Sequence, residues 1–161
     1  MDSFEHIRTM MSELGPTLKL AEVTEFSEEA TWLLIVNEDT TLVADYDADE
    51  DRLYLSADVA APPAEQRLEI YETLLQYNLG FRETGGMRMS LDGPGGTVVQ
   101  SCDLLAHGLE LDTLLTVVTN FTEKLFLWRE QVRSGIVSDS SNDDKPFDPN
   151  DPKHRGTMIR A

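Results

Sequence analysis

The stretch APPAEQRLEIYETLLQYNLGF, residues 61–81, decides how this chain folds. Its apolar residues recur at spacings of three and four, which predicts a helix over residues 64–79. A proline pair precedes this helix and Gly80 closes it. The apolar residues form two neighbouring stripes, namely Leu68, Tyr71, Leu75 and Leu79 in the first and Ile70, Leu74, Tyr77 and Phe81 in the second.

An ordinary surface helix carries one apolar stripe and a polar back. A helix with two stripes has to be covered on two sides, and the core of its own domain covers only one of them. In a chain of 161 residues, we expect a second copy of the same chain to cover the other. The alternative is a helix that lies deep inside a single core.

The remaining patterns predict an α+β fold, an antiparallel twisted sheet with three helices in the order α-β-β-β-β-α-β-β-α. A first helix is expected over residues 4–14, ended by Gly15 and Pro16. Strands are expected to begin at residues 18–23 and to follow at 32–36, 41–46 and 53–59, with acidic connectors at 25–29, 37–39 and 47–51. After the central helix, a hairpin over residues 87–102 turns at a glycine-rich loop. A last helix over residues 111–132 begins near Asp112, a candidate cap. Its apolar residues are expected to form one long face of Leu114, Leu115, Val118, Phe121, Leu125, Trp128 and Val132.

Charge restricts the class of partner. The chain has 30 acidic and 13 basic residues and a formal net charge of −17. Nucleic acid and anionic membranes would be repelled by such a body, whereas basic partners would be attracted. The longest apolar run, residues 32–36, is too short to insert across a bilayer, and nothing near Met1 resembles a signal peptide. We therefore expect a cytoplasmic protein.

The two parts of the chain differ in composition. Residues 1–133 hold 25 of the acidic and 9 of the basic residues, so this part is the acidic body and the expected domain. Residues 134–161 are rich in Ser, Asp and Pro, which predicts a mobile tail. The tail ends in a small basic and apolar tip, Met158–Arg160.

No pattern in the sequence predicts a catalytic residue, a metal site or a cofactor. The acidic run from Asp45 resembles the start of a calcium loop, but Glu50 and Ser56 stand where that loop requires Gly and Glu. The three histidines have no zinc-binding spacing. Cys102, the single cysteine, excludes an internal disulfide. A dyad of Cys102 with His107 is conceivable in a small enzyme, but a lone thiol in a strand is more often a core residue.

Several phrases resemble the class I type III secretion chaperones of the Tir-chaperone (CesT-like) family. Leu74–Leu79 is similar to the "LL-x-x-N-L" phrase of that family's dimer helix, and Met89–Asp92 is similar to the phrase before its glycine turn. The last helix, Leu111–Trp128, fits the closing helix, and residues 33–45 fit more loosely. The resemblance covers residues 4–133. It departs at residues 24–31, a longer acidic insertion that leaves the strand register open there.

The resemblance implies a bacterial cytoplasmic homodimer that binds the N-terminal segment of a type III secreted effector and keeps it export-competent without nucleotide. The alternative that it leaves open is a protein of the same fold that sequesters a regulator of secretion. The end of the tail, residues 156–160, is faintly similar to a member of that second kind. The implied dimer residues are Leu68, Tyr71, Leu75, Asn78 and Leu79. The implied effector-binding residues are Phe4, Ile7, Met10, Met11, Leu18, Leu20, Trp32 and Leu34. An exposed first helix with Met10 and Met11 would suit an adaptable patch, although core filling is the alternative for these methionines.

Overall fold

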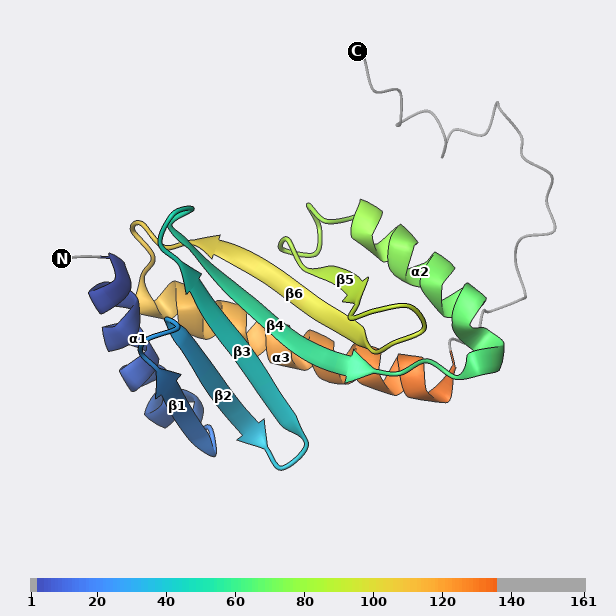
Figure 1. The fold of residues 1–161 in the computed structure, drawn as a ribbon, viewed down its shortest axis with the longest axis horizontal. Coiled ribbons are helices and arrows are strands. Elements are labelled where there is room, and N and C mark those ends of the chain that lie inside the picture. Colours follow the sequence, from blue (N-terminus) through green and yellow to red (C-terminus); the bar gives the residue numbers. More distant parts are fainter. Residues whose placement is uncertain (1–2, 136–161) are drawn as a thin grey trace, which may run out of the picture.

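The computed structural model describes residues 3–135, in which a six-stranded sheet and three α-helices form an α+β fold (Figure 1). The elements are α1 (Ser3–Leu18), β1 (Glu22–Phe26), β2 (Thr31–Asn37), β3 (Thr40–Asp47), β4 (Arg52–Ala60), the 3₁₀ turn η1 (Ala64–Gln66), α2 (Arg67–Leu79), β5 (Arg88–Leu91), β6 (Val98–Leu105) and α3 (Leu111–Ser134). The predicted class and element order are confirmed. The predicted mobile tail lies outside the described residues from residue 136 onward.

All neighbouring strands of the sheet are antiparallel, in the order β1-β2-β3-β4-β6-β5. The hairpin β5–β6 inserts β6 next to β4, so the strand that follows α2 in the chain becomes an edge. The two edge strands are therefore β1 and β5, at opposite sides of the sheet (Figure 1). An edge strand carries backbone N–H and C=O groups that have no strand partner on one side.

The core lies between the sheet and α3, which runs behind the sheet along the length of the molecule (Figure 1). In β4 the buried residues Leu53, Leu55, Ala57 and Val59 alternate with more exposed ones, as expected for a sheet covered on one face. The buried face of α3 consists of Leu114, Val118, Phe121, Leu125, Trp128 and Val132. This face is the predicted one, except that Leu115 is only partly buried. Asp112 lies in the first turn and makes no cap, because the helix begins after Glu110.

The first helix is longer than predicted. It runs through Gly15 and Pro16 to Leu18, and the positive φ of Lys19 (54°) ends it. A proline in the last turn removes only one helical hydrogen bond, so the helix continues for a further half turn. The carbonyl of Gly15 still accepts a hydrogen bond from the backbone N–H of Leu20 (3.0 Å).

The beginning of the sheet also corrects the prediction. Leu18 ends α1 and Leu20 lies in the connection, so the strand begins only at Glu22. The predicted acidic connector at residues 25–29 shrinks to a turn over residues 27–30, because Glu25 and Phe26 complete β1. The β1–β2 register is continuous from the pair Glu22 and Ile35 to the pair Phe26 and Thr31.

An arginine joins α3 to the sheet where β4 is irregular. The register between β4 and β6 shifts between Asp58 and Ala60. The Arg129 guanidinium donates to the carbonyls of Val59 (2.9 Å) and Asp58 (2.8 Å) and to the buried hydroxyl of Thr40 (2.6 Å). These bonds satisfy backbone carbonyls that the bulge would otherwise leave unpaired.

Within residues 3–135, no helix has the length and apolarity that a membrane span requires.

Candidate partner-binding surfaces

The helix α2 shows the two predicted stripes, except that Phe81 lies beyond its end and is exposed. Ile70 and Leu74 are buried in the core, and Tyr77 packs on Trp128 of α3 with ring centroids 4.9 Å apart. The other stripe faces outward, with Leu68 73%, Leu75 69% and Leu79 83% exposed. Three leucines this exposed along one helix form an unpartnered apolar surface on the described chain. We call Leu68, Leu75 and Leu79 the α2 stripe.

The other two residues that the resemblance assigned to the dimer surface are only partly exposed and have contacts within the single chain. Tyr71 is half-buried against the core. Asn78 turns to the neighbouring edge strand, where its Nδ2 donates to the carbonyl of Met89 and its Oδ1 accepts from the backbone N–H of Met89, both at 2.8 Å. The side chain thus imitates the backbone of a missing strand at the β5 edge. Asn78 is therefore an internal contact, because both of its polar atoms are already used.

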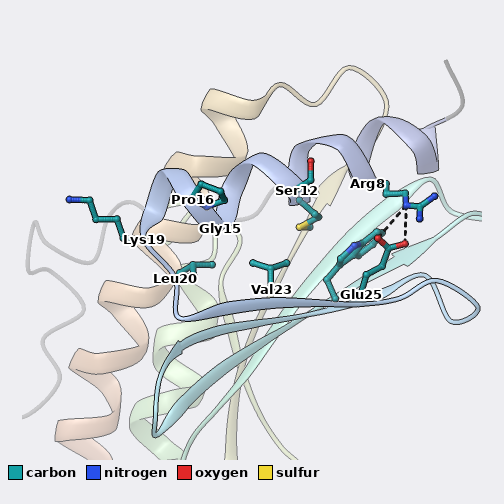
Figure 2. A pocket seen from close by; sticks show the side chains of 10 residues that line it. Arg8, Ser12, Gly15, Pro16, Lys19, Leu20, Val23 and Glu25 are labelled. Atoms are coloured by element: carbon teal, nitrogen blue, oxygen red, sulfur yellow. Dashed lines mark hydrogen bonds and ion pairs between the residues drawn. The ribbon is translucent and has the colours of Figure 1, made fainter.

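A groove of about 470 Å³ lies between α1 and β1 (Figure 2). Its residues come from both elements, from the connection between them and from β2. They are Arg8, Met11, Ser12, Gly15, Pro16, Lys19, Leu20, Val23, Glu25 and Trp32. The sequence did not indicate this groove, since no local pattern shows that α1 crosses the edge strand at this place.

An ion pair spans one end of the groove. Arg8 Nε lies 3.0 Å from Glu25 Oε1 and donates a hydrogen bond to Oε2 at 3.2 Å (Figure 2). A hydrogen bond from the hydroxyl of Ser27 and the pairing with Arg8 hold the pKa of Glu25 below its ordinary value. Both side chains remain in contact with solvent, 47% exposed for Arg8 and 26% for Glu25, so the pair contributes little to stability.

The groove adjoins the open edge of the sheet. In the described part of the chain, β1 pairs only with β2, so its outer side has no strand partner. Val23 and Glu25 line the groove while Thr24 between them points to the other face, as strand alternation requires. An extended chain added to β1 would therefore place alternate side chains in the groove.

The residues assigned to effector binding are mostly core residues. Ile7, Met10, Met11, Trp32 and Leu34 are buried. Of the two alternatives for Met10 and Met11, core filling is the one that the structure confirms, because α1 packs this face against the sheet and α3. Phe4 is half-buried, with its ring centroid 5.9 Å from that of Trp32. Leu18 is half-buried against the core. Met11, Leu20 and Trp32 do line the groove, so part of the set contributes to its wall.

The side chains considered for catalysis or metal binding lack the necessary environment. Burial raises the pKa of Cys102 to about 12, so its thiol is protonated at neutral pH and is a poor nucleophile. His107 is exposed in the connection after β6. Residues 3–135 contain no group of three or more His, Cys, Asp or Glu side chains that could hold a metal ion.

Comparison with solved structures identifies the fold. A chain of the ExsC–ExsE complex superimposes with a TM-score of 0.70 at 20% identity, covering 82% of this chain and 97% of that one. A chain of the HopA1–SchA chaperone–effector complex gives 0.66 at 20% identity, with 81% and 98% covered. The Yersinia pestis type III secretion chaperone SycH in complex with a fragment of YscM2 gives 0.58 at 18% identity, with 74% and 97% covered.

No curated protein matches the sequence. The sequence model of the Tir chaperone protein (CesT) family does match, over residues 9–129. This range runs from α1 to near the end of α3 and contains the α2 stripe and every groove residue except Arg8. The chain therefore belongs to the Tir chaperone protein (CesT) family.

Proposed function

We propose that this protein is a bacterial cytoplasmic chaperone that works as a homodimer. It binds the N-terminal segment of a type III secreted effector and keeps that segment unfolded and ready for export. The observation that carries this proposal is the open edge of β1 beside the groove of α1. Family membership and the fold shared with chaperone–effector complexes support it.

The binding mode is the addition of an extended segment to β1. The backbone of the segment pairs with the free N–H and C=O groups of β1, which holds any sequence that can extend. Selectivity comes from the groove, whose accessible apolar surface is formed by Pro16, Leu20 and Val23. Such binding needs no nucleotide, because it only has to compete with folding of the segment.

The second half of the proposal is self-association through the α2 stripe. The helix α2, which carries the stripe, lies at the opposite end of the molecule from the β1 edge (Figure 1), so pairing through α2 would leave both grooves of a dimer accessible. Burying three exposed leucines on each protomer provides the apolar surface that a stable association requires.

A secretion regulator in place of an effector is the second candidate. The same groove and edge would hold its extended segment, so the physical mode of binding is identical. The identity of the bound protein separates the two candidates.

The test is to capture the tagged full chain from a host that carries a type III secretion system. The co-purifying protein is identified by mass spectrometry, and the mass of the complex is measured by light scattering. Leu20→Glu places a charge in the groove, and we expect it to lose the partner. Leu105→Glu is the matched control, since Leu105 is an exposed leucine of β6 outside the groove, and we expect it to keep the partner.

A dimer that holds one secreted protein through its N-terminal segment would support the chaperone proposal. A dimer that holds a regulator would favour the second candidate. If Leu20→Glu retained the partner as fully as Leu105→Glu does, binding at the groove would be refuted.

A further inference from the structure

Asn78 is the one residue of α2 whose side chain forms hydrogen bonds to the sheet within residues 3–135. Its two bonds to Met89 join the last turn of the helix to the edge strand β5. The other contacts of α2 with the core are packing contacts, made by Ile70, Tyr71, Leu74 and the ring of Tyr77. Packing contacts tolerate small rotations of a helix, whereas two short hydrogen bonds to one residue tolerate little.

The position of Asn78 relates this attachment to the α2 stripe. Leu75 precedes it by three residues and Leu79 follows it directly, so both share its part of the helix. Asparagine is a poor residue for a helix interior, because its side chain competes for backbone groups. Here that side chain bonds instead to the strand β5, close to the place where Leu75 and Leu79 leave the helix.

We propose that Asn78 is a positioning residue for self-association. By holding Met89, it keeps the C-terminal half of α2 in the orientation that presents Leu75 and Leu79 to a second copy, and it does not itself contact that copy. This inference rests on the proposed homodimer and adds the residue that orients its surface.

The variant Asn78→Ala removes both hydrogen bonds without changing the α2 stripe. Thr73→Ala is the matched control, because the Thr73 hydroxyl bonds only to the Glu69 carbonyl of its own helix (2.9 Å). Two quantities are measured on the full chain, the dimer dissociation constant by sedimentation equilibrium and the hydrogen exchange rate of the Met89 amide. For Asn78→Ala we expect both to rise at least tenfold, while the amides of β4 remain protected. For Thr73→Ala we expect neither to change.

A second comparison separates positioning from a general loss of stability. If Asn78 acts by presenting Leu75, the effects of Asn78→Ala and Leu75→Ala on the dissociation constant are not additive in the double variant. Additive effects would overturn the proposal. If Asn78→Ala fails to fold, Asn78→Asp replaces it in the same cycle, since the carboxylate keeps the acceptor for the Met89 amide.

The outcomes distinguish this inference from the proposed function. A wild-type monomer would refute the homodimer itself. A wild-type dimer whose affinity is unchanged by Asn78→Ala, although Met89 loses protection, would refute only the positioning role. A weakened dimer in which Met89 stays protected would mean that Asn78 contacts the second copy, which also overturns the inference.

Discussion

Gly15 of α1 and Val23 of β1 lie so close that a Cβ atom on Gly15 would stand 2.8 Å from the Cγ2 atom of Val23. Real Cβ atoms essentially never approach a neighbour this closely. The hydrogen side chain of Gly15 therefore lets the helix rest directly on the edge strand. Both residues line the groove, so this contact sets its width (Figure 2).

Gly15→Ala should push α1 away from β1 or displace the Val23 side chain into the groove. We expect a loss of about 1–3 kcal/mol in the free energy of unfolding, as for other overpacked sites, together with weaker binding of the partner segment. Urea denaturation and a titration with the captured partner measure the two effects. Gly93→Ala is the control, because an added Cβ there meets nothing within 4 Å. Equal behaviour of the two variants would contradict the role assigned to Gly15.

Leu75→Glu should separate the proposed dimer. A carboxylate in an apolar interface costs roughly 3 kcal/mol, which corresponds to a dissociation constant about a hundredfold higher. Leu75 is 69% exposed in the single chain, so the fold itself should remain intact. Sedimentation equilibrium measures the mass and circular dichroism verifies the fold. Leu105→Glu, on a leucine that is 61% exposed, should stay dimeric. An unchanged mass for Leu75→Glu would show that the α2 stripe is not the interface.

Arg129→Ala should destabilise the fold more than any other arginine substitution on α3. It leaves the carbonyls of Asp58 and Val59 and the buried Thr40 hydroxyl without their donor. We expect a loss of about 2–3 kcal/mol in the free energy of unfolding, measured by chemical denaturation. Arg133→Ala, one turn further along α3 on an exposed side chain, should change stability by less than about 0.5 kcal/mol. Similar losses for the two variants would refute the anchoring role of Arg129.

Cys102 should react very slowly in the native protein. Burial raises its pKa from 9.0 to about 12, so at pH 8 the thiolate fraction is about a thousandfold below that of the unfolded chain. Alkylation with iodoacetamide at pH 8, followed by mass spectrometry, should therefore be fast only in urea. The same shift has a consequence for stability, since the unfolded thiol ionises first. The difference in free energy of unfolding between wild type and Cys102→Ala should be constant below pH 9. Between pH 9 and 12, wild type should lose stability relative to Cys102→Ala. Rapid alkylation of the native protein would contradict the buried, protonated thiol.

Periodicity alone predicted much of the architecture. The spacing of Leu114, Val118 and Phe121 gave the buried face of α3, and the two stripes of residues 64–81 gave a helix with one inner and one outer face. These predictions succeeded because a residue's angular position on a helix follows from its number in the chain. The prediction for the end of α1 failed at Pro16. A proline in the last turn of a helix removes one hydrogen bond without ending the helix, and α1 continues to Leu18.

The candidate sites were less accessible to sequence reasoning. The pattern placed Asn78 next to Leu75 on the helix, which suggested a shared surface, but its partner Met89 lies across a loop. Asn78 is a polar residue that lies between the two apolar stripes of α2. This position could have indicated that its side chain contacts another part of the same chain. The groove joins residues from Arg8 to Trp32 across three elements, and no local pattern indicates such a meeting.

The sequence by itself determined the helix with two apolar stripes, the antiparallel α+β plan and the acidic surface. These properties depend on composition and on local periodicity, and both can be determined from residues that are neighbours along the chain. The tertiary structure decided which stripe of α2 faces inward, that Met10 and Met11 fill the core, and that the β1 edge stays open while Asn78 covers the β5 edge. The physical reason is that burial and hydrogen bonding depend on segments distant in the chain, whose meeting is fixed only when the whole core packs.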